Sequence, residues 1–314
     1  MDIDSKTNHF DKLVIDVSNL YKIFPVTKKF NAKPNYIPCM SNTFYKLYRN
    51  QLFPLKIRRY AYRGFRQIHI DLTWFNLFKE YWGNILSGRP LWSVVDLFYL
   101  KNIYRSSFQN LEVQDTDNPH VHLDAWQAPE MLYSLLHYVT KESVTDFIHI
   151  IDHIKHFIGN INNCQLLEYG CSLAPISYSL YTFGKIYPKR IYIADIQALP
   201  FHYGAYRFRN TSNVIPILLQ PDNNFQLQLQ QQIDIIFCIE VFEHLNDPLT
   251  TVEIFNNTLR TNGFLFYDFI ESDGEGLDTL RAKTQRDLVI EFIKDNFQII
   301  FENEKTGLTI AQKK

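Results

Sequence analysis

The sequence predicts an α/β fold, in which a mainly helical N-terminal domain precedes a doubly wound, mostly parallel sheet of seven strands. From Pro129 onward, apolar stretches alternate with amphipathic ones, as strands and helices do in a parallel sheet. The last two apolar stretches are separated only by a short polar turn, so they should pair antiparallel. Residues 1–128 show no comparable order, and we therefore predict two domains, 1–128 and 129–314.

The ordered part begins with a predicted helix whose apolar residues, from Val144 to Ile158, recur at steps of three and four before Gly159. Five strands follow that are apolar on both faces, as expected where helices cover both sides of a sheet. They are predicted at Gln165–Tyr169, Arg190–Ile196, Val214–Leu219, Ile233–Val241 and Phe264–Ile270. Helices are predicted at Pro175–Phe183, Leu199–Arg209, Leu249–Arg260 and Asp278–Asp295, and the closing hairpin at Phe297–Glu302 and Leu308–Gln312.

The composition is that of a globular protein. Of the 314 residues, 46% are apolar and 21% charged, which excludes a disordered or collagenous chain. No apolar run reaches the roughly 18 residues of a membrane span, and the polar residues among the first thirteen exclude a signal peptide, so we expect a cytoplasmic protein without membrane insertion. The four cysteines show no CxxC spacing, and free thiols are expected: Cys39, Cys164, Cys171 and Cys238.

A basic segment interrupts the otherwise balanced charge. Between Val17 and Ile70 there are eleven Lys or Arg residues, interleaved with aromatic ones, and no Asp or Glu. Such a segment suits an anionic small molecule or saccharide, and equally a face that contacts an acidic partner domain. The net charge of −1 makes nucleic acid the less favoured partner.

The segment after the first predicted strand carries a carboxylate and then small residues: Glu168, Gly170, Ser172 and Ala174. Ligands bind at this end of the strands in doubly wound sheets, and short side chains let the backbone approach them closely. The single glycine excludes the GxGxxG pattern of dinucleotide enzymes and the glycine-rich loop of P-loop proteins.

Here the sequence resembles the class I S-adenosylmethionine-dependent methyltransferases. Their first motif is an acidic residue followed by Gly-x-Gly-x-Gly; Glu168 and Gly170 match it, and Ser172 and Ala174 depart from it. Asp195, which closes the next strand, matches the second acidic residue of the family. Residues 234–248 and 259–266 resemble its fourth-strand motif and the turn and strand that follow, so the resemblance extends over about residues 142–312.

The resemblance implies S-adenosylmethionine as cofactor. Asp195 would accept hydrogen bonds from both ribose hydroxyls, and Glu168 from the amino-acid end or its bound water. The alternative for these carboxylates is helix capping. The remaining residues implied for cofactor binding are Gly170, Cys171, Ser172, Ile196 and Glu240.

Catalytic candidates follow the fourth and fifth strands. His244 lies beside the expected acceptor position and could take a proton from a hydroxyl, since the pKa of imidazole lies near neutrality. Glu243 and Asp268 are further candidates. In some O-methyltransferases of the family a similar Glu-x-x-Glu-His run binds a divalent metal, here Glu240, Glu243 and His244; in others it caps a helix without metal, and we favour the metal-free interpretation.

Three weaker candidates surround this centre. His120, His122 and Asp124 would share one side of an extended segment, a spacing that could bind metal or supply a base, although a polar loop is the commoner explanation. Trp126 and Gln127 could roof the cofactor. Finally, Asp222 is expected in a plain turn, and residues 273–278 either form a lid or begin a helix capped by Asp278.

The predicted function is therefore transfer of the S-adenosylmethionine methyl group to a small or saccharide-type acceptor, with an oxygen favoured over nitrogen or carbon. Two alternatives remain: a non-catalytic binding module that kept the fold, which Ser172 and Ala174 would support, and an RNA methyltransferase. A nicotinamide enzyme lacks its glycine fingerprint here.

Overall fold

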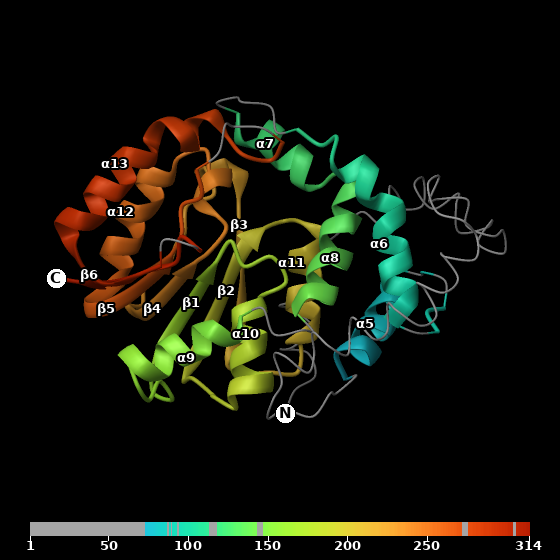
Figure 1. Ribbon diagram of the computed structural model, residues 1–314, viewed down its shortest axis with the longest axis horizontal. Coiled ribbons are helices and arrows are strands. Elements are labelled where there is room, and N and C mark those ends of the chain that lie inside the picture. The colour runs from blue at the N-terminus through green and yellow to red at the C-terminus, as the bar shows by residue number, and fades with distance from the viewer. Residues whose placement is uncertain are drawn as a thin grey trace.

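The computed structural model describes residues 73–86, 88, 90–92, 94–112, 118–142, 147–271, 276–303 and 306–314. The basic segment, Cys39 and residues 273–275 lie outside these ranges. Seven strands of the described residues form one sheet in the order β3-β2-β1-β4-β5-β7-β6 (Figure 1). The strands are β1 (Gln165–Tyr169), β2 (Arg190–Ile196), β3 (Val214–Leu219), β4 (Ile233–Cys238), β5 (Leu259–Tyr267), β6 (Phe297–Glu302) and β7 (Thr309–Lys313). The first five pair in parallel, and β7 runs antiparallel to β5 and β6. The predicted fold class is confirmed.

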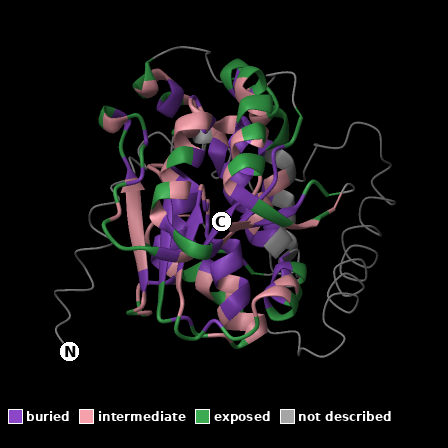
Figure 2. Cartoon of the chain, turned by 90° about the vertical axis from the view of Figure 1, so that its left-hand side faces the viewer, coloured by how far each residue is buried: buried purple, intermediate pink, exposed green. Residues whose placement is uncertain are grey.

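Helices cover both faces of this sheet because the strands are apolar on both. Alternate residues of β1, such as Leu166 and Leu167, enter two separate core clusters. The cluster around Leu166 includes side chains of α9 (Ile148–Phe157), α10 (Pro175–Ser179) and α11 (Leu199–Arg207). The cluster around Leu167 includes α12 (Pro248–Thr258) and α13 (Leu280–Asn296). Figure 2 shows the buried residues concentrated between these layers.

A further helical layer packs on the outer side of α11. It contains α5 (Thr73–Asn84), α6 (Val94–Phe108) and α8 (Leu132–Glu142), whose buried residues form a third cluster with Leu199, Tyr203 and Tyr206 of α11. Since α8 belongs to this layer, the helical part extends past residue 128, and the domain boundary stays a prediction. None of the described helices combines the length and apolar character that crossing a membrane would require.

Several predicted boundaries are displaced where the backbone leaves regular geometry. The fourth strand ends at Cys238 rather than Val241, because Glu240 adopts a left-handed φ of 56° and leads into the short helix η6 (Phe242–His244). The fifth strand begins at Leu259, five residues earlier than predicted, and ends at Tyr267. The last helix is capped by Thr279, whose hydroxyl accepts from Ala282 N at 2.9 Å, and not by Asp278.

The segment from His120 to Asp124 is helical, so the expectation that it is an extended strand or a loop is wrong. It belongs to α7 (Pro119–Trp126), which begins because Asn118 Oδ1 accepts from His120 N at 3.0 Å and Pro119 occupies the first turn. On a helix, residues two apart point in different directions, so His120, His122 and Asp124 do not form one ligand set.

Candidate active site

A cavity of about 540 Å³ opens at the carboxyl ends of β1 to β4, between the sheet and the helical layer. Its volume lies in the range of small-molecule sites. The sheet side of its lining includes Gly170, Ser172, Asp195, Ile196, Asn224, Phe225, Glu240 and His244. The helical side includes Phe108, Gln109, Leu111, His122, Trp126, Met131, Tyr133, Ser134, His137 and Tyr138.

Glu168 lies beneath the rim of this cavity and does not line it. Its Oε1 accepts from Ile176 N at 2.9 Å, and its Oε2 accepts from Ser177 N at 2.8 Å and from the Ser177 hydroxyl. Burial raises the pKa of this carboxyl to about 7, against these hydrogen bonds, which lower it. The geometry is that of a helix cap on α10, and direct contact with a cofactor stays a prediction.

The rim after β1 has a strained backbone at the two positions where the family motif has glycine. Ser172 and Ala174 both adopt left-handed conformations, with φ of 50° and 57°. Such a conformation costs a residue with a side chain roughly 1–2 kcal/mol. Gly204 of α11 lies so close that an added Cβ would stand 3.0 Å from the backbone of Leu173. The fold therefore keeps the loop in place despite the non-glycine residues.

Asp195 faces the cavity from the end of β2. Its Oδ2 accepts from Ser172 N at 2.5 Å and its Oδ1 from Ile196 N at 2.7 Å, so this one side chain ties the first rim loop to the second strand. Burial raises its pKa to about 6, although these two hydrogen bonds lower it. Each oxygen keeps a lone pair that a ligand hydroxyl could use.

Glu240 lies across the cavity, just after β4, and its left-handed backbone is held by Asp268. Asp268 Oδ1 accepts from Glu240 N at 2.6 Å. Asp268 itself is buried and does not line the cavity; burial raises its pKa to about 6. It therefore acts on the site through Glu240.

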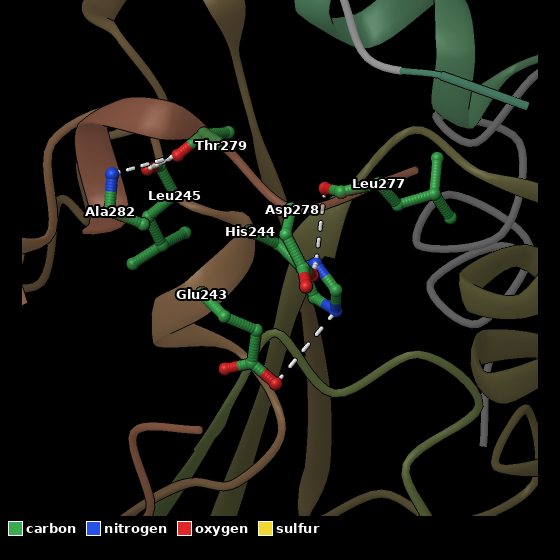
Figure 3. Close-up of polar contacts among 7 residues, drawn as sticks. All are labelled: Glu243, His244, Leu245, Leu277, Asp278, Thr279 and Ala282. Atoms are coloured by element: carbon green, nitrogen blue, oxygen red, sulfur yellow. Dashed lines mark hydrogen bonds and ion pairs between the residues drawn. The ribbon is translucent and has the colours of Figure 1, made fainter. Parts of the chain in front are cut away.

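His244 projects from η6, with Glu243, Leu277 and Asp278 around its ring (Figure 3), and it lines the cavity. Its Nδ1 lies 2.8 Å from Asp278 Oδ1 and 3.1 Å from the Leu277 carbonyl oxygen. Burial lowers the pKa of His244, but Asp278, Glu243 and the Leu277 carbonyl raise it, and the net shift is upward. Two acceptors at Nδ1 fix the hydrogen there, which leaves Nε2 able to accept a proton.

Glu243 is buried next to His244 but does not line the cavity. Its Oε1 is 4.0 Å from His244 Nε2, and its Oε2 has no hydrogen-bond partner. Burial raises its pKa to about 7 even though His244 opposes the shift. The pKa of the Glu243 carboxyl therefore lies close to physiological pH, and the carboxyl packs behind the His244 imidazole.

Two residues of α7 supply the opposite wall. His122 is 5% exposed and its Nδ1 has no hydrogen-bond partner; Trp126 Nε1 likewise has none. Burial, followed by the charge of His244, lowers the pKa of His122 to about 4, so its imidazole is neutral at physiological pH. The Trp126 ring stands edge to face with that of His244, with centroids 5.2 Å apart. Asn246 Oδ1 is a third unpartnered polar atom at the cavity.

Other candidate residues lie away from this centre. Asp222 is exposed and pairs with His120 Nε2 at 3.1 Å, joining α7 to the turn after β3. Gln127 Nε2 donates to Gln197 O at 3.0 Å. Cys171 is buried outside the lining, and the three described cysteines are free. Within the described ranges, no group of three or more His, Cys, Asp or Glu residues could hold a metal ion.

The sequence did not single out several lining residues. Asn224 and Phe225 follow β3, and Asn246 follows η6. Phe225 has a left-handed φ of 57°, which no sequence pattern reveals. Tyr133 and Tyr138 come from α8. The sequence shows that the chain is rich in aromatic residues but not that these two line a cavity.

No known family model matches the chain, and no curated protein matches it. Solved structures resemble it weakly. The N-methyltransferase NodS from Bradyrhizobium japonicum WM9, in complex with S-adenosylhomocysteine, is 13% identical over 52% of this chain and 84% of its own, with a TM-score of 0.40. A methyltransferase from Aquifex aeolicus described as dependent on S-adenosylmethionine is 16% identical over 54% and 90%, also at 0.40. Coclaurine N-methyltransferase, bound to N-methylheliamine and S-adenosylhomocysteine, is 13% identical over 80% and 78%, at 0.41.

These likenesses are distant, and strand order and direction define the fold without them. The first three parallel strands lie in the order β3-β2-β1, and the chain then returns to place β4 and β5 on the other side of β1. β7 pairs antiparallel with β5. This arrangement is the sheet of the class I S-adenosylmethionine-dependent methyltransferases. The chain has that fold.

Proposed function

We propose that the protein transfers the methyl group of S-adenosylmethionine to an oxygen atom of a small acceptor. The observation that carries the proposal is the position of Asp195, a half-buried carboxylate facing the cavity at the carboxyl end of β2. It could accept from both hydroxyls of a ribose. The short residues Gly170 and Ser172 beside it leave room for the nucleoside, so the residues present fit this cofactor.

When bound, the cofactor supplies a methyl group on a positively charged sulfur. His244 would take the hydroxyl proton at Nε2 as the acceptor oxygen receives the methyl group. Asp278 and the Leu277 carbonyl keep the imidazole oriented during that transfer. The enclosing α7 excludes water and holds the acceptor in line, which contributes more than any single base.

Replacing His244 by Ala tests the proposed base. We expect turnover of whichever acceptor the protein methylates to fall about 100-fold, the lower range for loss of a general base, with affinity for S-adenosylhomocysteine unchanged. Radiolabelled methyl transfer and calorimetric titration measure the two quantities. His149→Ala, an exposed histidine on α9, is the control. Full turnover of His244→Ala across the pH range would rule out the base.

The nature of the acceptor is a finer part of the proposal. An anionic or saccharide acceptor was expected from the basic segment, which lies outside the described residues. A second candidate function is cofactor binding without catalysis. The strained residues Ser172 and Ala174, which replace the family's glycines, support it. Binding of S-adenosylhomocysteine with no methyl transfer to any cell extract would favour it. RNA binding that persists at high salt would instead favour an RNA methyltransferase.

A further inference from the structure

Helix α7 carries two polar atoms without hydrogen-bond partners, and both point to the side of the cavity where the acceptor is expected. His122 and Trp126 are four residues apart on α7, so they lie on the same face, and their ring centroids are 6.4 Å apart. Both line the cavity, and neither His122 Nδ1 nor Trp126 Nε1 has a hydrogen-bond partner. Buried polar atoms are nearly always paired, so such a concentration at a cavity indicates a ligand that completes the pairs.

The two nitrogens can play complementary roles, with Trp126 Nε1 donating and His122 Nδ1 accepting when the imidazole hydrogen is on Nε2. An indole nitrogen only donates, whereas an imidazole nitrogen without its hydrogen accepts. Since burial keeps the His122 imidazole neutral at physiological pH, one of its nitrogens is an acceptor. A hydroxyl group, which both donates and accepts, matches this pair.

The charge of the cavity argues against an anion. The described lining residues include four carboxylates, Asp195, Glu240, Asp247 and Asp278, and no Lys or Arg. An anionic acceptor would lose its hydration beside these four carboxylates, and the imidazole of His244, whose pKa is raised, is already paired with Asp278.

The shape and chemistry of the helical side favour a ring over a sugar. Phe108, Leu111, Tyr133 and Tyr138 contribute apolar and aromatic surface there. Flat apolar surface recognises the face of an aromatic ring. A saccharide carries hydroxyls around its whole ring and would bury several of them against this surface without partners.

We propose that His122 and Trp126 recognise the acceptor, and that the acceptor is a small neutral aromatic compound bearing a hydroxyl group. This inference rests on the proposed function, since it names the acceptor of the same site. It replaces the anionic or saccharide acceptor that the basic segment suggested.

Three probes test the acceptor class on the full chain by calorimetry, each with and without S-adenosylhomocysteine. They are 2-naphthol, naphthalene-2-sulfonate with the same ring system but a negative charge, and methyl β-glucoside. We expect 2-naphthol to bind about tenfold more tightly than either of the others. Tighter binding of the sulfonate or the glucoside, or no binding of 2-naphthol, overturns the inference.

Two variants test the recognising residues. His122→Phe and Trp126→Phe keep a ring but remove the unpartnered nitrogen, and each should weaken 2-naphthol binding about tenfold. The melting temperature of free His122→Phe should be unchanged or higher, because a buried atom without a partner is gone. His120→Phe, on the same helix but outside the cavity, is the matched control and should leave the affinity unchanged. If His122→Phe does not fold, Trp126→Phe decides alone.

The outcomes separate the two proposals. If S-adenosylhomocysteine binds but neither variant changes the affinity for 2-naphthol, the acceptor inference is wrong and the proposed function stands. If S-adenosylhomocysteine produces no heat while 2-naphthol binds in a manner that depends on His122, the proposed function is wrong and the recognition surface stands.

Discussion

Two groups of residues at the cavity use their buried polar atoms in opposite ways: the rim after β1 and β2 with Glu168 beneath it, called here the paired wall, and the side chains of α7 and η6 with Glu243 behind His244, called here the unpaired wall. On the rim formed after β1 and β2, all four carboxylate oxygens of Glu168 and Asp195 accept hydrogen bonds from backbone N–H groups. On α7 and η6, three buried side-chain atoms have no hydrogen-bond partner: His122 Nδ1, Trp126 Nε1 and Glu243 Oε2. The first wall is therefore organised before any ligand arrives, whereas the second gives up stability to keep its hydrogen-bonding capacity for a ligand or a proton.

The paired wall is tested most strongly at Asp195. Asp195→Ala removes two proposed charged hydrogen bonds to the ribose and releases Ser172 N, so affinity for S-adenosylhomocysteine should fall roughly 1,000-fold, or about 4 kcal/mol. Calorimetric titration measures the loss. The control is Asp287→Ala, whose side chain is 98% exposed. An Asp195→Ala protein that binds as tightly as the original would remove the cofactor assignment of this wall.

The unpaired wall is tested at Glu243, where the raised pKa makes stability depend on pH. Between its ordinary value of 4.5 and its folded value of about 7, the unfolded chain ionises this carboxyl more readily, so folding stability falls as pH rises through that interval. Glu243→Gln cannot ionise and should lack this loss, which is on the order of 3 kcal/mol.

Urea unfolding of both proteins at several pH values between 4.5 and 8 measures this difference. The two curves should diverge as the pH rises, with the variant relatively more stable at the alkaline end. Parallel curves would mean that Glu243 is paired in solution, and that the contrast between the walls is smaller than the structure indicates.

The smallest effect concerns the strain stored in the paired wall. Ala174→Gly should stabilise the protein by about 0.5 kcal/mol, because relief of the left-handed backbone slightly exceeds the entropy that glycine adds to the unfolded chain. Ala205→Gly, inside α11, is the matched control and should destabilise by about 1 kcal/mol. Equal destabilisation of both variants would show that the loop is not strained.

Much of the paired wall was predictable from the sequence. Strands that are apolar on both faces leave an unambiguous pattern, so the sequence predicts β1, β2 and β3 at their observed bounds, and with them the position of Asp195. The unpaired wall was not predictable in the same way. The direction of His122 depends on the helix that Asn118 and Pro119 begin, and the turn at Glu240 depends on a backbone angle that sequence does not encode locally.

The helix α11 determines how ligands could enter and leave. One of its sides, with Phe201 and Ala205, packs on the sheet, and the other, with Leu199, Tyr203 and Tyr206, packs on the outer helices. Moving those outer helices away would expose the apolar side chains of α11 to water. By contrast, α7 is linked to the turn after β3 by the exposed pair of His120 and Asp222, so separating α7 from that turn would cost less than moving the outer helices.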